Sequence, residues 1–296
     1  HHAWIVSSLA KDVAPHVPVV TQSHATGLRQ MTLCPHLADD VRVGLARQDA
    51  FLALHDANAQ ALSAALGVAR SRVTVVGAGY RDDLFRLDDA VERREEAVLF
   101  VGKISRAKGL PWLLDAIERL AVSRPRLHLH VAGAGAGKEA DALVTRMRAM
   151  GGARVTLHGQ LDHAALAGLM RRVRVLVLPS LFEGLPLVLI EACASGCRVV
   201  VTDLEIVREA LAPALGPWLR TVDRPRLRRA DRPVEEDLPR FVEHLTRAID
   251  ASLDEPVTSL PRGALASFTW SAVFRRIEPV WTQLLAARDG EGRTGG

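Results

Sequence analysis

Two glutamates lie in a short segment where carboxylates could bind a ligand. Glu183 is in a loop after an apolar run, and Glu191 is the one acidic residue of the otherwise apolar helix predicted over 187–195. An unpaired carboxylate in such a helix is costly, so Glu191 needs a partner, such as the hydroxyl groups of a ligand. Gly184 and Pro186 suit a close approach and a helix start. Helix-start and ion-pair roles are the structural alternative for the two glutamates.

Lysine is scarce in this chain, so its positions are informative. Of the 38 basic residues, four are lysines: Lys11, Lys103, Lys108 and Lys138. Lys103 and Lys108 share one loop after the strand predicted over 98–102, at the carboxyl end of a sheet, where α/β proteins bind ligands. With Arg106 they could neutralise a diphosphate. A solvated loop is the alternative, and the scarcity of lysine favours the functional interpretation.

A glycine-rich turn at 133–138 follows one predicted strand and opens a predicted helix, where backbone N–H groups can hold phosphate. It is not a P-loop, because the first required glycine is Ala132 and Glu139 stands where Ser or Thr is needed. Segment 135–140 fits the loose dinucleotide fingerprint, but the next predicted strand ends without an acidic residue for a ribose. A plain tight turn is favoured over a dinucleotide site.

The elements around these residues predict parallel sheets, because short β-branched runs alternate with helical patterns. In the second half, strands are expected at 98–102, 127–132, 155–158, 173–178 and 198–202, with helices at 111–122, 139–150, 164–171 and 187–195. Five such strands suffice for one doubly wound domain. Further helices are predicted at 242–252 and 271–287, and 220–240 is expected to be a surface excursion.

The first half contains fewer elements. Strands are predicted at 18–21, 51–54 and 73–76, helices at 4–13 and 57–66, and an interdomain linker at 81–96. Three strands do not complete a doubly wound domain and would leave an open sheet edge. We therefore expect that this half lacks its opening βα units.

Composition narrows the class of protein. Hydrophobic residues make up 48% and charged residues 24% of the 296 residues, which indicates a globular chain of about two domains. Aromatic residues, at 4%, are too few for base stacking with nucleic acid. The net charge of +4 suits acidic substrates, but no run of five like charges occurs. Three cysteines without a CxxC pair indicate neither a disulfide framework nor a zinc site.

Several motifs together resemble the family-4 retaining glycosyltransferases, which have the GT-B fold. The segment 179–192 has two glutamates separated by seven residues, as in the signature of that family. Other segments resemble the family in the same order along the chain: the strand-end histidine segment 19–24, the segment 75–80 before the linker, the diphosphate loop 100–109, the nucleotide-side turn 131–135, the base-contacting loop 157–161, the stretch 194–200, and 268–270 before the last helix.

The resemblance implies roles for the residues that match. Glu191 would accept hydrogen bonds from the ribose and Glu183 from the donor sugar, while Lys103 and Lys108 would stabilise the leaving diphosphate. His24 would orient or polarise the sugar. The implied catalytic set is His24, Lys103, Lys108 and Glu183. The implied nucleotide-sugar set is Gly102, Lys103, Lys108, Gly133, Gly159, Gln160, Leu161, Glu183, Gly184, Leu185, Pro186, Leu187 and Glu191.

The expected protein is thus an α/β enzyme of the GT-B type with two Rossmann-like domains, the N-terminal one incomplete. The boundaries are 1–93 for a partial acceptor-side domain with linker, 94–270 for the nucleotide-sugar domain, and 271–296 for a helix that crosses back. Two departures stand out: Lys103 replaces the usual arginine, and Glu205 with Ile206 occupies a segment that is often glycine-rich.

The expected reaction moves a sugar from a nucleotide-diphosphate sugar to an acceptor hydroxyl with retention, without a metal or a further cofactor. The acceptor could be a small molecule, a glycan or a lipid-linked molecule, and no nucleic acid is involved. The absence of a disulfide framework makes a reducing cytoplasm the expected location, with peripheral contact at the inner membrane face left open. No apolar run reaches the length of a membrane span. A non-catalytic truncated homologue and a nucleotide-dependent oxidoreductase are the alternatives.

Overall fold

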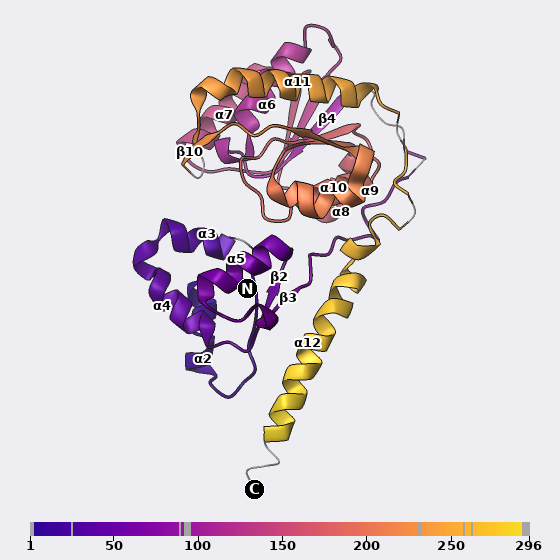
Figure 1. Cartoon of the computed structure of the whole chain (residues 1–296). Helices are drawn as coiled ribbons and strands as arrows, with labels where there is room; N and C mark the ends of the chain where they lie inside the picture. Colours follow the sequence, from indigo (N-terminus) through magenta and orange to yellow (C-terminus); the bar gives the residue numbers. More distant parts are fainter. Residues whose placement is uncertain are drawn as a thin grey trace. The chain divides into compact units, whose positions relative to one another are not determined.

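The structure is a computed structural model of the chain that describes residues 3–24, 26–88, 90–91, 96–229, 232–256, 258–261 and 263–291. The chain divides into two compact units, each with its own parallel sheet (Figure 1). The first unit is His1–Gly79 with Ala266–Gly296, and the second is Tyr80–Leu265. Positions 89 and 92–95 of the predicted linker lie outside the described residues.

A six-stranded parallel sheet forms the centre of the second unit, in the order β6-β5-β4-β7-β8-β9. The strands are β4 (Ala97–Val101), β5 (His128–Ala132), β6 (Val155–Gly159), β7 (Val175–Leu178), β8 (Arg198–Thr202) and β9 (Leu219–Val222). Five of them fall where the sequence predicts strands. The edge strand β9 was missed, because it is short and mostly half-buried and so lacks the continuous apolar run of an inner strand.

Helices cover both faces of this sheet (Figure 1). They are α6 (Leu110–Leu120), α7 (Lys138–Ala149), α8 (His163–Met170), α9 (Leu187–Ala194), α10 (Ala212–Leu215) and α11 (Leu238–Asp254). A single core cluster joins α6, α7 and α11 to the sheet, and in it the rings of Trp112 and Phe241 meet edge to face at 6.0 Å. The predicted excursion contains β9 and the antiparallel hairpin of β10 (Leu227–Arg229) and β11 (Arg232–Pro233).

The first unit has a three-stranded parallel sheet in the order β1-β2-β3. The strands are β1 (Val20–Gln22), β2 (Ala50–Ala53) and β3 (Val73–Val75), and the helices are α1 (Ile5–Ser8), α2 (Ala10–Val13), α3 (Thr26–Leu33), α4 (Pro35–Ala46) and α5 (Asp56–Leu66). The helix predicted over 4–13 is two short helices that meet at Leu9. The sequence did not predict α3 and α4, whose polar residues obscure the apolar period.

The last helix, α12 (Trp270–Glu291), belongs to the first unit. Its Val273 and Ile277 pack against Leu52 and Val76 beside the small sheet. Arg276 Nε also donates to the Val76 carbonyl oxygen at 2.9 Å, which fixes the rotation of the helix. Across the part of the chain that the structure describes, no helix combines the length and apolarity needed to span a membrane.

Candidate functional site

The candidate site is the carboxyl edge of the six-stranded sheet, where the loops after β4, β5, β6 and β7 meet. Parallel strands bring these loops together, and ligands bind there in open α/β sheets. Backbone hydrogen bonds join the loops to one another: Gly102 N to Ala132 O at 3.0 Å, Ile104 N to Ala134 O at 3.0 Å, Gly133 N to Gly159 O at 2.7 Å, and Leu181 N to Ala107 O at 2.9 Å. The edge is therefore a connected framework.

Two glycines let these loops approach closely. Gly109 has a φ of 74°, and a Cβ there would stand 2.0 Å from the Pro179 carbonyl oxygen. A Cβ on Gly133 would stand 1.9 Å from the Gly102 carbonyl oxygen. A side chain at either position would push the loops apart, so both glycines are needed for the geometry of the site.

Lys108 and Glu183 form an ion pair, with 2.6 Å between Nζ and Oε1. The two residues are 75 positions apart, and their side chains are 30% and 11% exposed. Both were predicted to contact the donor, one at the diphosphate and one at the sugar. The two side chains satisfy each other, so a phosphate that binds at this loop must share Lys108 with Glu183.

Glu191 lies on α9, whose first turn begins after Pro186. Its carboxylate has no hydrogen bond or ion pair within the described residues, although the side chain is largely buried. Burial raises the pKa of Glu191 to about 7, against an ordinary value of 4.5. A carboxyl group that is unpaired and titrates near neutrality is suited to a ligand that supplies hydroxyl donors.

The other predicted cations differ in their surroundings. Lys103 is exposed and carries no ion pair within the described part of the chain. Arg106, in contrast, contacts Glu235 at 3.4 Å, and its guanidinium lies over the Trp112 ring at 5.6 Å. The Arg106 N–H also donates to Glu139 Oε1 at 2.8 Å. Arg106 thus has structural contacts of its own, whereas Lys103 carries no ion pair within the described residues.

The remaining predicted nucleotide contacts lie at the end of β6 and between β7 and α9. Gly159 closes the strand with a φ of 67°, and the exposed Gln160 and half-buried Leu161 follow it. Asp162, which the sequence analysis did not single out, caps α8 by accepting from Ala165 N at 2.8 Å. Gly184, Leu185 and Leu187 lie between β7 and the first turn of α9.

His24 lies in the first unit, directly after β1. The neighbouring Ser23 N–H donates to Leu52 O at 2.8 Å, and Asn58 Nδ2 donates to Ser23 Oγ at 3.4 Å. Another histidine, His55, caps α5 after β2, where its Nδ1 accepts from the Asn58 N–H at 3.3 Å. The carboxyl edge of the small sheet therefore presents two histidines, and the sequence analysis identified only the first.

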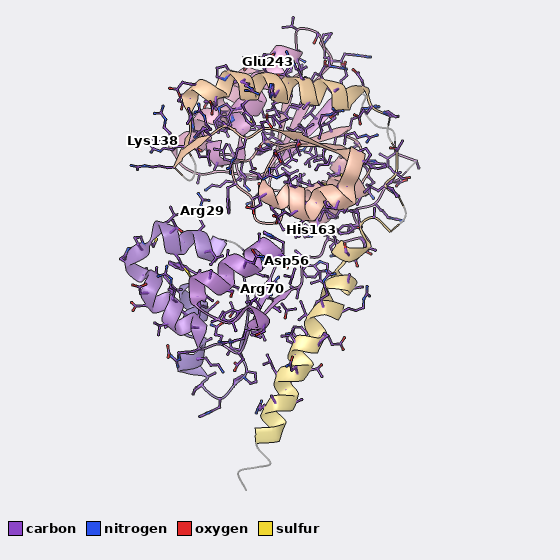
Figure 2. The ribbon with its side chains drawn as sticks, in the orientation of Figure 1. Arg29, Asp56, Arg70, Lys138, His163 and Glu243 are labelled. Carbon is purple, nitrogen blue, oxygen red and sulfur yellow. The ribbon has the colours of Figure 1, made fainter. Side chains whose placement is uncertain are left out.

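The glycine-rich turn after β5 is explained by packing. A Cβ on Gly135 would stand 2.6 Å from the Ile104 carbonyl oxygen and 2.7 Å from the Ala140 side chain. Lys138 begins α7 and is exposed (Figure 2). The close approach accounts for the glycine without a dinucleotide, as the tight-turn interpretation requires.

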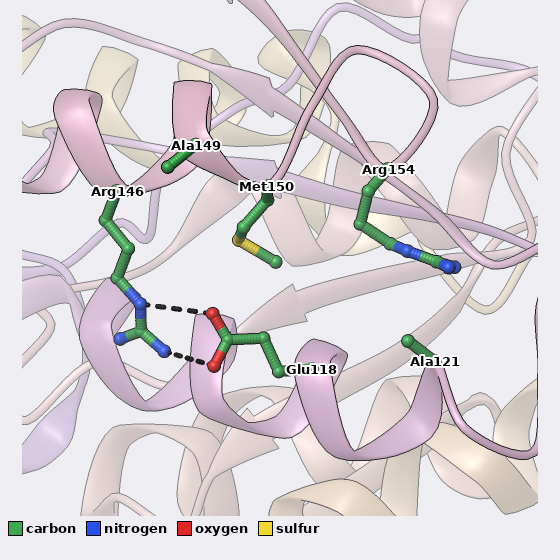
Figure 3. Close-up of a pocket in the computed structure, with 6 residues that line it drawn as sticks. All are labelled: Glu118, Ala121, Arg146, Ala149, Met150 and Arg154. Atoms are coloured by element: carbon green, nitrogen blue, oxygen red, sulfur yellow. Dashed lines mark hydrogen bonds and ion pairs between the residues drawn. The ribbon is translucent and has the colours of Figure 1, made fainter.

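A pocket of about 380 Å³ lies elsewhere in this unit, between the later parts of α6 and α7 (Figure 3). Arg146 there is paired with Asp115 and Glu118 at 2.6 and 2.8 Å. Arg154 Nη1 donates to three backbone carbonyl groups. Since these cations are already satisfied, the pocket offers no free charge to a ligand.

In the described residues, no three His, Cys, Asp or Glu side chains are placed to share a metal ion.

Part of the chain is similar to a known family. The family described as "Glycosyl transferases group 1" matches residues 95–221. Glycogen synthase of Mycobacterium tuberculosis H37Rv is 27% identical over 98% of this chain and 69% of its own length. D-inositol 3-phosphate glycosyltransferase 1 of Catenulispora acidiphila is 28% identical over 99% of this chain and 73% of its own length.

Solved structures show the same fold. Anabaena HepE in complex with UDP-glucose has a TM-score of 0.66 at 17% identity, over 94% of this chain and 75% of its own. Sucrose-phosphate synthase from Thermosynechococcus elongatus has a TM-score of 0.63 at 20% identity, over 90% of this chain and 68% of its own. The oxidoreductase alternative has no support from these matches. The chain is thus similar to the group 1, or family-4, glycosyltransferases over residues 95–221, and it has the GT-B fold of the solved structures.

Proposed function

We propose that this chain transfers a sugar from a nucleoside-diphosphate sugar to an acceptor hydroxyl, with retention of configuration and without a metal ion. The observation that carries the proposal is the grouping of Lys108, Glu183 and Glu191 at one edge of the second sheet. These residues supply a cation, a paired carboxylate and an unpaired carboxylate to the same region. A donor has matching parts, namely a diphosphate, a sugar and a ribose.

The order of the strands supports a definite orientation for the donor. The base would contact Gly159, Gln160 and Leu161 at β6, and the diphosphate would lie over the β4 loop. The N–H groups at the Leu187 end of α9 would add their partial positive charge to that of the lysines. The sugar would then lie at the β7 loop with Glu183, while the ribose hydroxyls donate to Glu191.

In this arrangement the lysines, and not a metal ion, stabilise the negative charge of the diphosphate. The C–O bond between the sugar and the diphosphate breaks, and negative charge grows on the leaving phosphate oxygen. The acceptor oxygen bonds to the same sugar carbon, and its hydroxyl proton passes to that phosphate oxygen. Lys108 has three N–H donors and can contact that oxygen while it keeps Glu183. Lys103 adds a second positive charge, so the charge that develops in the transition state is stabilised. His24 of the first unit would polarise the sugar, as the family resemblance implies.

The test uses the full chain with UDP-glucose and a panel of acceptors. Proton NMR of the product gives the anomeric configuration, and retention predicts the α-product from the α-donor. Activity should be unchanged in EDTA, because no step uses a metal. A strict magnesium or manganese requirement, or a β-product, would contradict the proposal.

Calorimetric titration with UDP tests the residues separately from turnover. Lys108→Ala should weaken binding by about 10- to 150-fold, since a hydrogen bond to a charged group contributes about 1.5–3 kcal/mol. Arg119→Ala, an exposed substitution on α6, is the matched control and should bind like the parent. Parental affinity in Lys108→Ala would remove this lysine from the site, and UDP binding without transfer would support the alternative of a non-catalytic homologue.

A further inference from the structure

Asn58 is a buried polar residue outside the catalytic and nucleotide-sugar sets. It is 4% exposed and lies in the first turn of α5, which packs beside β2 in the first unit (Figure 1). A buried amide costs free energy unless it forms hydrogen bonds, so its partners show what it holds in place. Asn58 Oδ1 accepts from the Leu54 N–H at 3.2 Å, and Asn58 Nδ2 donates to Ser23 Oγ at 3.4 Å. One side chain therefore joins the segments that follow β1 and β2.

The segment after β1 carries His24. β1 lies at the edge of the small sheet and is three residues long. Beyond it, the Ser23 N–H donates to the Leu52 carbonyl oxygen at 2.8 Å, and His24 follows directly. A short edge strand is a weak anchor, because little backbone pairing holds the residues after it. The bond from Asn58 to Ser23 is therefore important for the position of His24.

The backbone of Asn58 also fixes the other histidine at this edge. The Asn58 N–H donates to His55 Nδ1 at 3.3 Å. A neutral imidazole that accepts at Nδ1 carries its proton on Nε2, so this contact sets the tautomer of His55. A substitution of the Asn58 side chain removes the link to Ser23 and leaves this backbone link. Such a substitution thus acts on the segment of His24.

A second buried amide bridges the same strands at their other end. Gln48 is fully buried before β2; its Oε1 accepts from Thr21 Oγ1, and its Nε2 donates to the Ser7 carbonyl oxygen. Ligands bind at the carboxyl ends of parallel strands in open α/β sheets, and Gln48 lies at the amino end of β2. Gln48 and Asn58 are therefore matched in chemistry and burial, but only Asn58 lies at the edge that carries His24.

We propose that Asn58 is a positioning residue for sugar transfer, which holds the segment after β1 so that the His24 imidazole can act on the donor sugar. The inference rests on the proposed function, because it takes His24 to polarise that sugar. Asn58 is buried, so it acts through Ser23 and His24 and not on the substrate. A displacement of about 1 Å in a reacting group can cost about 100-fold in rate, so loss of this bridge should lower kcat by about 10- to 100-fold.

Steady-state kinetics of the full chain test this with UDP-glucose, measuring transfer to a panel of acceptors and release of UDP by hydrolysis. Asn58→Leu keeps the volume of the side chain, removes both of its hydrogen bonds and should show the loss of kcat. Asn58→Asp should restore most of kcat, because its two oxygens can accept from the Leu54 N–H and the Ser23 hydroxyl. UDP affinity should stay parental in both variants, because the nucleotide contacts lie in the second unit.

Gln48→Met is the matched control for a loss of buried hydrogen bonds in this unit. It should unfold at a lower urea concentration than the parent and keep the kcat of the parent within about twofold, because it leaves the carboxyl edge intact. Parental kcat in Asn58→Leu would overturn the inference. An equal loss of kcat in Gln48→Met would overturn it as well, since the effect would then belong to the stability of the unit.

A double-mutant cycle with His24→Ala separates positioning from a general structural effect. If Asn58 acts through His24, Asn58→Leu lowers kcat in the parent but not in His24→Ala, because the group that it positions is already absent. The same fold-loss in both backgrounds would overturn the inference.

NMR of the chain labelled with ¹³C-histidine measures the position of His24 without turnover. The ring Cε1–Hε1 signal of His24, assigned with His24→Gln, should shift in Asn58→Leu and in Ser23→Ala and stay in place in Gln48→Met. An unshifted signal in Asn58→Leu would overturn the inference. A parent that neither transfers nor hydrolyses UDP-glucose would instead refute the proposed function, and the His24 signal would still decide whether Asn58 positions this histidine.

Discussion

Nucleotide affinity should rise with pH because of Glu191. Burial raises its pKa to about 7, and its carboxylate has no partner within the described residues. In the proposed function the ribose hydroxyls donate to Glu191, so they would bind its ionised form. The ionised fraction is roughly one tenth at pH 6 and nine tenths at pH 8. UDP affinity should therefore increase by about tenfold, or about 1.4 kcal/mol, over this range.

Calorimetric titration with UDP between pH 5.5 and 8.5 measures this effect. The terminal phosphate of UDP itself titrates at about pH 6 and adds its own pH dependence. The parent is therefore compared with Glu191→Gln under identical conditions. The glutamine is uncharged at every pH, and the slope that belongs to Glu191 should disappear in it. If both proteins show the same pH profile, Glu191 does not bind the ribose and the reasoning fails.

The same residue links stability to pH in the opposite direction. Its folded-state pKa of about 7 exceeds the ordinary 4.5, so the folded chain keeps a proton that the unfolded chain loses. This contribution is complete below pH 4.5 and is lost as the pH rises through 7, by about 3 kcal/mol. Glu191→Gln should therefore unfold at higher urea concentration than the parent at pH 8, while it binds UDP more weakly.

Three further substitutions test other parts of the second unit. Burial and the charge of Arg172 lower the pKa of His158. The free energy of unfolding should therefore fall as the pH drops below about 6.5, and the urea midpoints at pH 5.5 and 7.5 should differ less in His158→Gln than in the parent. Gly109→Ala should lose at least about 1–2 kcal/mol of stability and most UDP binding, because its Cβ would meet the Pro179 carbonyl oxygen. Parental stability and parental UDP affinity would show that the loops do not need a glycine at this position. Trp112→Ala should cost about 3–5 kcal/mol in urea unfolding, and a cost below 1 kcal/mol would show that this core is not close-packed.

Local patterns in the sequence predicted most of the strands of the second sheet. Inner strands such as β4 and β7 are buried on both faces, so they are nearly continuous apolar runs. The segment with Glu183 and Glu191 was identifiable because a carboxylate in an apolar helix is unusual. The scarcity of lysine similarly drew attention to Lys103 and Lys108.

Contacts between distant segments could not be predicted in this way. The pairing of Lys108 with Glu183 depends on two loops that meet only when β4 and β7 pair. The contact between Arg106 and Glu235 spans 129 positions, so no local pattern could show that this cation has a carboxylate beside it. Edge strand β9 lacks an apolar run, so it had no sequence signal either.

The two lysines of the β4 loop would contribute to different steps of donor binding. Lys108 is already neutralised by Glu183, so it exerts little pull on a distant diphosphate. Lys103 is exposed, and its field extends over about 10 Å at 0.1 M salt. In the proposed function, Lys103 would thus govern how fast the donor arrives, and added salt should slow that step. Lys108 would engage only after the donor has docked, and it would govern how long the donor stays.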